Sequence, residues 1–226
     1  MLATGVLGAA DDPWLRWDWI SSHIPVIRDA LTQHVELTVI AVLIGLLIAL
    51  PLGLAGWRWR LLRGPIFSIT GILYTIPSLA LFALLIPITG LTVLTAEVGL
   101  VSYTLLILIR NIVVGLDSVP AEVREAARGM GYRPLAEVLA VEVPLAVPAI
   151  MAGLRVATVT TIGLVTVTAL IGEGGLGSLM LDGLIRDFRT PLVVGTLLSI
   201  ALAIVADLGL TGLQRLVTPW ARRSAT

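Results

Sequence analysis

The residue types missing from this chain limit the chemistry it can perform. It contains no cysteine and no lysine, and its two histidines, His23 and His34, precede the first long uncharged stretch. Disulfides, thiolate metal sites and cysteine nucleophiles are therefore excluded. A P-loop is excluded too, because it needs a lysine to reach the nucleotide phosphates. We expect no metal site, no cofactor bound by this chain and no enzymatic activity of its own.

Three charged residues lie inside apolar stretches, where a charge is expensive and so marks a functional candidate. They are Arg110, Arg155 and Asp207. At about 1.5 Å per residue, all three fall roughly 10 to 16 Å from the same ends of their helices. Our hypothesis is that Asp207 pairs with Arg110 or Arg155 near an inner gate. The alternative is that each side chain snorkels to the headgroups.

Further polar and aromatic residues within the apolar stretches are candidates for a transport pathway. These candidates are Tyr74, Thr75, Pro77, Ser78, Tyr103, Asn111 and Thr158. Pro77 interrupts a helix, and Thr75 and Ser78 can satisfy the backbone groups that it frees. Tyr74 and Tyr103 offer aromatic faces to a quaternary ammonium. Helix kinking and packing are the alternative explanation for each residue.

The composition places the chain in a lipid bilayer. Its 226 residues are 57% hydrophobic and only 13% charged, which leaves too little polar surface to cover a soluble core. A helix that crosses the hydrocarbon needs about 20 mainly apolar residues. We therefore predict an all-helical, multi-pass membrane protein with about five spans, at residues 37–57, 65–88, 98–116, 144–171 and 191–213. A loop is expected over residues 91–96.

A lead-in precedes the predicted spans. The first ten residues lack the basic stretch of a signal peptide. Residues 14–30 mix tryptophan with charged residues, as helices on a membrane surface do; a short polar segment is the alternative. We expect residues 1–30 to form an extracytoplasmic lead-in and residues 31–226 the transmembrane domain.

Arginine gathers in segments that five spans would place on one side of the membrane. These arginines are Arg58, Arg60, Arg63, Arg124, Arg128, Arg133, Arg215, Arg222 and Arg223. Cytoplasmic loops retain basic residues, so we predict a cytoplasmic C-terminus and an outside N-terminus. The formal net charge is zero, and nothing suggests a nucleic-acid partner.

A polar insert at residues 117–143 falls on this predicted cytoplasmic side. Pro120 is pre-set for a first helical turn, and Gly129 with Gly131 can end the helix. The insert is therefore expected to hold a short helix over residues 121–128 between the third and fourth spans.

A distinctive spacing joins Glu125, Ala126, Ala127, Gly131, Val141, Val143 and Pro144. This spacing resembles the signature loop of ABC importer permeases, and the resemblance makes Arg128 and Gly129 part of the same coupling loop. Valines stand here where the family has an isoleucine and a leucine. The resemblance implies that the loop couples to a separate ATP-binding subunit, which would bind ATP and Mg²⁺.

Other segments look like permeases for glycine betaine, choline, carnitine and related osmoprotectants. These segments are residues 74–81, Arg110 with Asn111, and residues 171–177. The resemblance implies a permease of the prokaryotic cytoplasmic membrane that works by alternating access. Its partners would be a second permease copy or a related permease, and an external substrate-binding protein. The alternatives are a permease for amino acids such as methionine, or an ion-coupled secondary transporter.

Residues 172–177 satisfy the G-x-G-x-x-G pattern, which indicates a dinucleotide site only between a strand and a helix. Here the pattern follows a predicted span on the outer side. We expect a flexible turn that starts a re-entrant or surface segment at residues 176–188. Charged residues around it are candidates for docking the binding protein, namely Glu173, Asp182, Arg186, Asp187 and Arg189.

Overall fold

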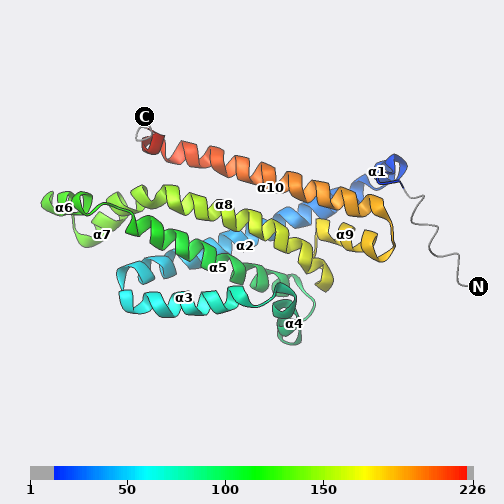
Figure 1. The fold of residues 1–226 in the computed structure, drawn as a ribbon, viewed down its shortest axis with the longest axis horizontal. Coiled ribbons are helices and arrows are strands. Elements are labelled where there is room, and N and C mark those ends of the chain that lie inside the picture. Colours follow the sequence, from blue (N-terminus) through cyan, green and yellow to red (C-terminus); the bar gives the residue numbers. More distant parts are fainter. Residues whose placement is uncertain (1–12, 223–226) are drawn as a thin grey trace, which may run out of the picture. The chain divides into compact units, whose positions relative to one another are not determined.

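The computed structural model describes residues 13–222, which are almost entirely helical (Figure 1). Residues 1–12 of the expected lead-in lie outside the described residues. The helices are α1 (Trp17–Ser22), α2 (Ile24–Arg58), α3 (Arg60–Thr75), α4 (Ser78–Thr89), α5 (Val93–Asp117), α6 (Ala121–Gly129), α7 (Pro134–Glu137), the π-helix η1 (Val138–Glu142), α8 (Val143–Val167), the 3₁₀ helices η2 (Thr168–Ile171) and η3 (Pro219–Arg222), α9 (Leu176–Ile185) and α10 (Arg189–Val217).

Four helical segments are long and apolar enough to cross a membrane. They are Ile24–Arg58, Val93–Asp117, Pro134–Ile171 and Arg189–Val217, and the bent pair α3 and α4 makes a fifth. The predicted all-helical fold with about five spans is therefore confirmed. Four of the predicted spans lie within these segments.

The second predicted span is two helices rather than one. The chain leaves α3 at Ile76 and enters α4 after Pro77, and both residues have extended backbone angles. Proline has no N–H to donate and pushes the preceding residue out of the helical region. Gly90 ends α4 with a φ of 75°.

The loop expected at residues 91–96 is wrong, because α5 already begins at Val93. The Thr92 hydroxyl oxygen lies 3.4 Å from the amide nitrogen of Thr95. A threonine in this position satisfies a free N–H of the first turn, and the helix can start directly after the Gly90 turn.

Helix α2 begins well before the predicted first span. His34 is therefore part of this helix and is buried, which corrects the expectation that both histidines precede the first span. Arg28, Asp29 and Glu36 are exposed on the same helix, whereas Leu37 is buried beside His34. The charged residues that argued against a helix here occupy its outer face.

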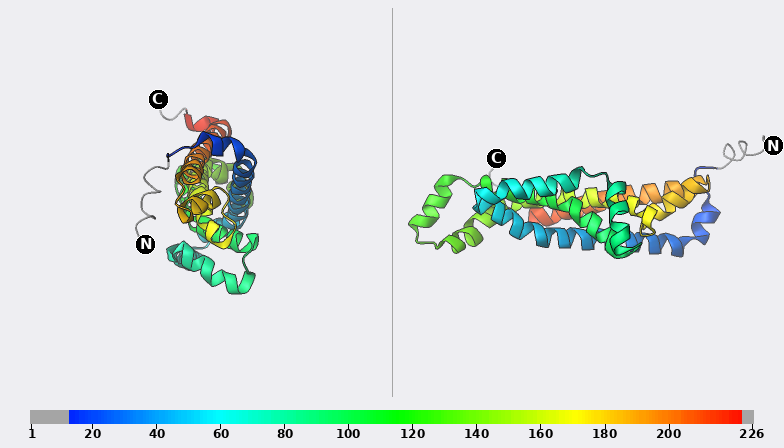
Figure 2. Two further views of the ribbon diagram at one scale, coloured as in Figure 1. Left: turned by 90° about the vertical axis from the view of Figure 1, so that its right-hand side faces the viewer. Right: turned by 90° about the horizontal axis from the view of Figure 1, so that it is seen from below.

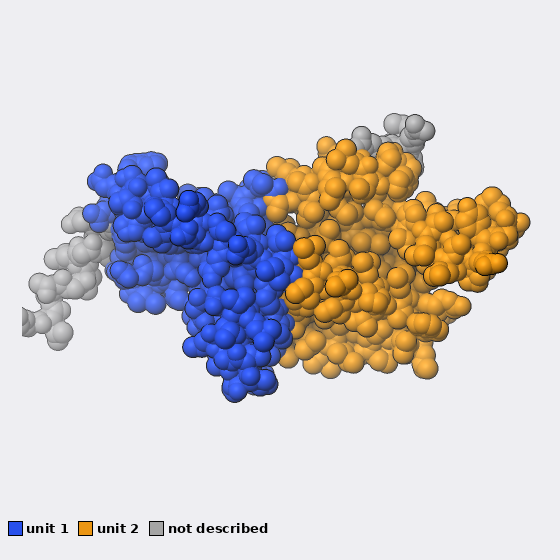
Figure 3. Space-filling model, turned by 180° about the vertical axis from the view of Figure 1, so that it is seen from behind, with its two compact units in different colours: residues 1–41, 77–100, 160–205 blue, residues 42–76, 101–159, 206–226 orange. Residues whose placement is uncertain are grey.

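The chain divides into two compact units, coloured separately in Figure 3. Unit 1 consists of residues 1–41, 77–100 and 160–205, and unit 2 of residues 42–76, 101–159 and 206–226. Four boundaries fall within α2, α5, α8 and α10, and a fifth lies between α3 and α4.

Small residues bring the helices of unit 2 close together. A Cβ atom on Gly53 of α2 would lie 2.6 Å from Ile112 of α5, and one on Gly153 of α8 would lie 2.4 Å from Asn111. Glycines at such contacts let helix backbones approach each other in a membrane. The buried core of this unit includes Ile109, Ile112, Val113 and Leu116 of α5.

Candidate functional site

The first five signature residues, Glu125 to Gly129, lie on α6, which the ribbon views place beyond the end of α5 and the start of α8 (Figures 1 and 2). Helix α6 runs from Ala121 to Gly129, close to the predicted range, and Gly131 follows it with a φ of 83°. Glycine adopts this left-handed conformation at little cost. The predicted short helix of the insert is therefore confirmed.

Helix α6 has two chemically different faces. Glu122, Glu125, Ala126 and Gly129 are exposed, and their spacing of three and four residues places them on one side of the helix. Ala127 is completely buried. The two alanines of the motif therefore differ in role: Ala127 packs against this chain, and Ala126 belongs to the exposed face.

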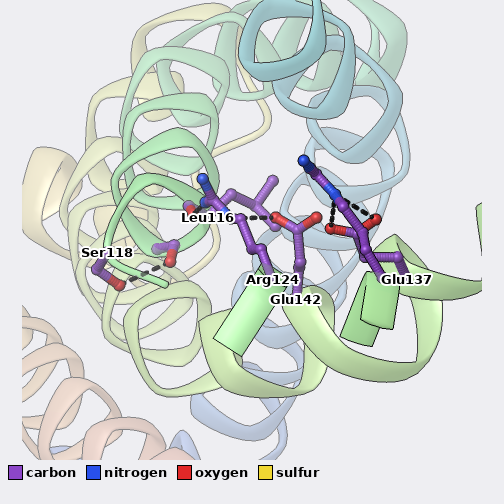
Figure 4. A network of polar contacts seen from close by, with 7 residues as sticks. Leu116, Ser118, Arg124, Glu137 and Glu142 are labelled. Atoms are coloured by element: carbon purple, nitrogen blue, oxygen red, sulfur yellow. Dashed lines mark hydrogen bonds and ion pairs between the residues drawn. The ribbon is translucent and has the colours of Figure 1, made fainter. Parts of the chain in front are cut away.

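An ion pair anchors the inner face of α6 to the turn before α8. The Nε atom of Arg124 lies 3.0 Å from an oxygen of Glu142, whose side chain is only 3% exposed (Figure 4). The Arg124 guanidinium also stands over the Trp57 ring at 5.6 Å. A buried carboxylate needs such a partner, because an unpaired charge there is strongly destabilising.

A second ion pair lies one helical turn further along α6. The Nε atom of Arg128 donates to both oxygens of Glu137, at 3.0 and 3.1 Å. The Glu137 side chain is 5% exposed, whereas Arg128 is 66% exposed. This carboxylate raises the pKa of the Arg128 guanidinium above its ordinary value. Arg124 and Arg128 are four residues apart and so share one face of the helix.

The same network satisfies the end of α5. Arg124 donates to the carbonyl of Leu116 at 2.6 Å, and the Ser118 hydroxyl donates to the carbonyl of Gly115 at 2.7 Å (Figure 4). These are among the last carbonyls of the helix, which have no partner within it. Asp117 pairs with Arg63 of α3 at 2.7 Å. Arg124 thus contacts both the end of α5 and the segment that leads into α8.

The remaining signature residues surround a π-helical turn. Residues 138–142 form η1, in which the amide of Val143 bonds to the carbonyl of Val138. Pro144 follows directly, and it has no N–H to donate to the preceding turn. Val141 and Pro144 line a small cavity together with Trp220. Val143 packs against the core of unit 2.

Two of the three charges predicted inside spans form a pair. Arg155 of α8 donates from Nε and Nη2 to the two carboxylate oxygens of Asp207 on α10, each at 2.8 Å. Both side chains are about one third exposed. Arg110 is exposed and has no ion pair within residues 13–222. Of the two pairings considered for Asp207, the structure contains the one with Arg155.

Several pathway candidates near the break between α3 and α4 make ring contacts or hydrogen bonds within the chain. The rings of Tyr74 and Tyr103 meet edge to face with centroids 5.8 Å apart, and the hydroxyl of Tyr103 donates to the carbonyl of Ile76. Thr75 donates to Ile72 within its own helix. The carbonyl of Ile76 at the break is therefore satisfied by Tyr103, whereas Thr75, which was expected to act on the break, bonds within its own helix.

Asn111 and Thr158 make local hydrogen bonds. Asn111 donates to the carbonyl of Ile107, and Thr158 donates to the carbonyl of Leu154, each one turn back in its own helix. Asn111 also packs closely against Gly153. These contacts are those of helix packing, which was the alternative explanation for both residues.

The glycine-rich turn of unit 1 is tightly held. Gly172 and Gly175 have positive φ angles of 89° and 50°, and a Cβ atom on Gly177 would lie 2.4 Å from the carbonyl oxygen of Thr166. The expectation of a flexible turn is wrong, because backbone and side chains surround it on several sides.

Gln33 and His34 of α2 hold this turn. Gln33 accepts from the amide of Gly175 at 3.0 Å and donates to Glu173 at 2.8 Å. The His34 ring nitrogens meet the carbonyl of Ile162 at 3.0 Å and the amide of Leu176 at 3.3 Å. His34 is therefore a neutral imidazole that donates from Nε2 and accepts at Nδ1.

The other residues proposed for docking lie around α9. Asp182 pairs with Arg186 at 2.6 Å on an exposed surface, Asp187 has a φ of 53°, and the Arg189 guanidinium stands 5.1 Å from the Trp14 ring centre. Glu173 is the exception, since its carboxylate is engaged by Gln33.

Sequence reasoning missed Arg124, Glu137, Glu142, Gln33 and His34. A signal was present for the first three: two arginines four residues apart precede two glutamates five residues apart, and the stretch that holds the glutamates, residues 134–143, is otherwise apolar. These arginines and glutamates can pair only if the connection after α6 folds back. Gln33 and His34 gave no comparable signal.

The described residues form several candidate membrane-spanning helices with a short helix exposed between two of them. Comparison with known proteins gives the family. Residues 37–222 match the family described as binding-protein-dependent transport system inner membrane component, and the chain belongs to this family.

Curated relatives agree with the family. The chain is 40% identical over 192 residues to the osmoprotectant import permease protein OsmW of Salmonella typhimurium, covering 83% of this chain and 89% of that protein. It is 38% identical over 188 residues to the choline transport system permease protein OpuBB of Bacillus subtilis, covering 83% and 86%. The predicted resemblance is confirmed.

Solved structures confirm the fold. An inward-facing structure of the MetNI methionine ABC transporter matches with a TM-score of 0.76 and 23% identity, covering 85% of this chain and 96% of that one. A second inward-facing form of MetNI matches with a TM-score of 0.70 and 20% identity, covering 90% and 100%. At these identities the likeness concerns the fold alone.

Proposed function

We propose that this chain is the permease subunit of an ATP-driven importer for a small osmoprotectant such as glycine betaine, choline, carnitine or a proline-like solute. The relatives at 40% and 38% identity, which are permeases for osmoprotectants and for choline, support this substrate class. The methionine alternative has support only from a fold likeness at 23% identity.

The arrangement of α6 is the observation that carries the coupling role. Its inner face is ion-paired to this chain, which leaves Glu122, Glu125, Ala126 and Gly129 exposed for a partner. An ATP-binding subunit that holds ATP and Mg²⁺ would contact this face. Its movement would reach α5 through Leu116 and α8 through Glu142, and shift the chain between inward-open and outward-open populations.

The other proposed partners follow from the family. A second copy of this chain, or a related permease, would complete the pathway, and an external binding protein would deliver the solute to the surface around α9. The N-terminus would lie outside, with residues 1–30 as a lead-in to the transmembrane domain at 31–226. The C-terminus would lie in the cytoplasm of a prokaryote, below its inner membrane.

Uptake by proteoliposomes tests the substrate class. The chain would be reconstituted with its ATP-binding subunit and binding protein, and uptake of labelled glycine betaine, choline and carnitine measured with and without internal ATP. We expect uptake only with ATP, and competition among quaternary amines. Uptake driven by an ion gradient without ATP would establish a secondary transporter. Stimulation by methionine and not by quaternary amines would overturn the substrate class.

Enlarging the exposed face of α6 tests the coupling role. Ala126→Trp should abolish copurification of the ATP-binding subunit without unfolding the chain, because Ala126 is exposed. Ser21→Trp is the matched control, a similar increase in size at an exposed position of α1. Retention of the ATP-binding subunit by Ala126→Trp would contradict the proposal.

The Arg155 and Asp207 pair is proposed to hold α8 and α10 together near an inner gate. If it does, transport by the double variant Arg155→Gln with Asp207→Asn should be no slower than transport by the worse single variant. Strictly additive losses would show that the two residues act separately.

A further inference from the structure

A polar cavity of about 470 Å³ lies beside the junction of α2 and α3 in unit 2. Five arginines and three acidic residues contribute to its lining. Three of these arginines are paired: Arg63 with Asp117, Arg124 with Glu142, and Arg128 with Glu137. Every carboxylate of the cavity is therefore already neutralised by an arginine of this chain.

Arg58 and Arg60 are the two arginines that remain. Both are exposed, and neither has an ion pair among the described residues. They flank Trp59, whose extended backbone separates α2 from α3. The cavity therefore carries an excess of two positive charges at the end of a membrane-spanning helix, and its chemistry suits an anion.

An apolar groove of about 400 Å³ adjoins this cavity. The two share four lining residues: Trp57, Arg58, Pro134 and Val138. From there the groove reaches Pro51 and Leu54 within the span of α2, and it is bordered by Leu135 and Leu139, which are exposed. The groove thus runs from the charged cavity into the hydrocarbon region of the membrane.

Tryptophans mark the level at which charge gives way to hydrocarbon. Trp57 lines both the cavity and the groove, and Trp59 lines the groove. Indole side chains concentrate at the headgroup level of a bilayer. A ligand that fills both spaces must carry a negative head and an apolar tail, with the transition between them at these rings.

We infer that the cavity and groove together bind one anionic phospholipid, its phosphate at Arg58 and Arg60 and an acyl chain along Leu135 and Leu139. The charge excess selects the headgroup and the groove selects the chain. Under the proposed topology this lipid belongs to the cytoplasmic leaflet. It would contact α7 and η1, and therefore the segment that carries the partners of Arg124 and Arg128.

Lipid binding to the purified full-length chain tests this inference. Native mass spectrometry would measure affinity for dioleoylphosphatidylglycerol and for dioleoylphosphatidylcholine, which share their acyl chains. A basic residue near an anionic lipid surface contributes a roughly fivefold gain in affinity. Arg58→Gln with Arg60→Gln should therefore weaken phosphatidylglycerol binding about thirtyfold, and phosphatidylcholine binding much less, because the choline charge offsets that of the phosphate.

Two controls distinguish recognition of the lipid headgroup from an effect of the protein's net charge and from binding of any free anion. Arg28→Gln with Arg186→Gln removes the same charge at exposed positions of unit 1, and it should change phosphatidylglycerol binding less than twofold. Inorganic phosphate at millimolar concentration should not displace the lipid. Displacement by phosphate alone would show a simple anion site and overturn the lipid assignment.

The groove has its own test. Leu135→Gln with Leu139→Gln should weaken binding of both lipids severalfold. An unchanged phosphatidylglycerol preference in the arginine double variant would overturn the inference. The measurement needs neither ATP nor substrate, so its outcome is independent of the proposed function.

Discussion

Two connections in this chain hold helices together by opposite means. In unit 2, α6 is attached through long arginine side chains that reach the buried Glu137 and Glu142. In unit 1, the turn at residues 172–177 is held by close packing at its glycines and by the neutral side chains of Gln33 and His34, which accept hydrogen bonds from the amides of Gly175 and Leu176. A long charged side chain can follow a moving partner, whereas glycine backbones packed so closely that a Cβ atom would not fit cannot. The first connection suits a moving part and the second a fixed one.

The glycine turn should show the largest effect on stability. Gly177→Ala would place a Cβ atom 2.4 Å from the carbonyl oxygen of Thr166, and we expect it to lower the free energy of unfolding by about 3 kcal/mol or more, because backbone cannot yield. Thermal unfolding in detergent would measure the change. Gly163→Ala, in the same helix as Thr166 but with no atom within 4 Å, should be nearly neutral. A tolerated Gly177→Ala would remove the basis for calling this turn fixed.

Loss of the Arg124 ion pair should have the second largest effect on stability. Arg124→Gln would leave the Glu142 carboxylate buried without its partner, at a cost of about 2 kcal/mol, somewhat below the range for fully buried pairs because Arg124 is one quarter exposed. Transport should fall further than stability does, since the contacts to both α5 and η1 are lost. The double variant with Glu142→Gln should regain stability but not transport. Recovery of both would mean that the pair acts only in folding.

How far the sequence predicts this structure is clear from these two regions. The bounds of α6 follow from Pro120 and from Gly129 with Gly131, which act locally. The pairing of Arg124 with Glu142 depends instead on the fold-back through α7 and the π-turn, which no local pattern specifies. The glycines at 172–177 were visible, but what surrounds them was not, because Gln33 and His34 lie far away in sequence.

The contacts of Gln33, whose own side chain carries no charge, should matter less and should not depend on salt. Gln33→Leu would leave the amide of Gly175 without its acceptor, which costs about 1 to 2 kcal/mol for a partly buried group. Unfolding midpoints at low and at high salt should shift by equal amounts. Thr32→Leu, an exposed position on the same helix whose hydroxyl bonds only within its own helix, is the control. A loss of stability in Gln33→Leu that depends on salt would contradict the proposed difference between this turn and α6.

Arg128→Gln should give the smallest loss, and the one most sensitive to salt. Arg128 is 66% exposed, and solvent and ions screen such a pair. The difference in unfolding midpoint between this variant and the wild type should shrink as sodium chloride rises toward about 1 M, where the screening length is near 3 Å. Arg133→Gln, exposed at the start of α7, controls for net charge. A loss that persists in high salt would place Arg128 with Arg124 as a buried anchor.

The π-turn at residues 138–142 affects the direction in which α6 and α7 project from α8. A π-helical turn holds one more residue than an α-helical one, and successive residues of an α-helix point about 100° apart. Deleting Ala140 alone would restore an α-helical repeat and turn α6 and α7 about the axis of α8 by roughly that angle. The direction in which α6 projects thus depends on the number of residues in this turn. Inserting or deleting one residue here would rotate α6 without changing any residue on it.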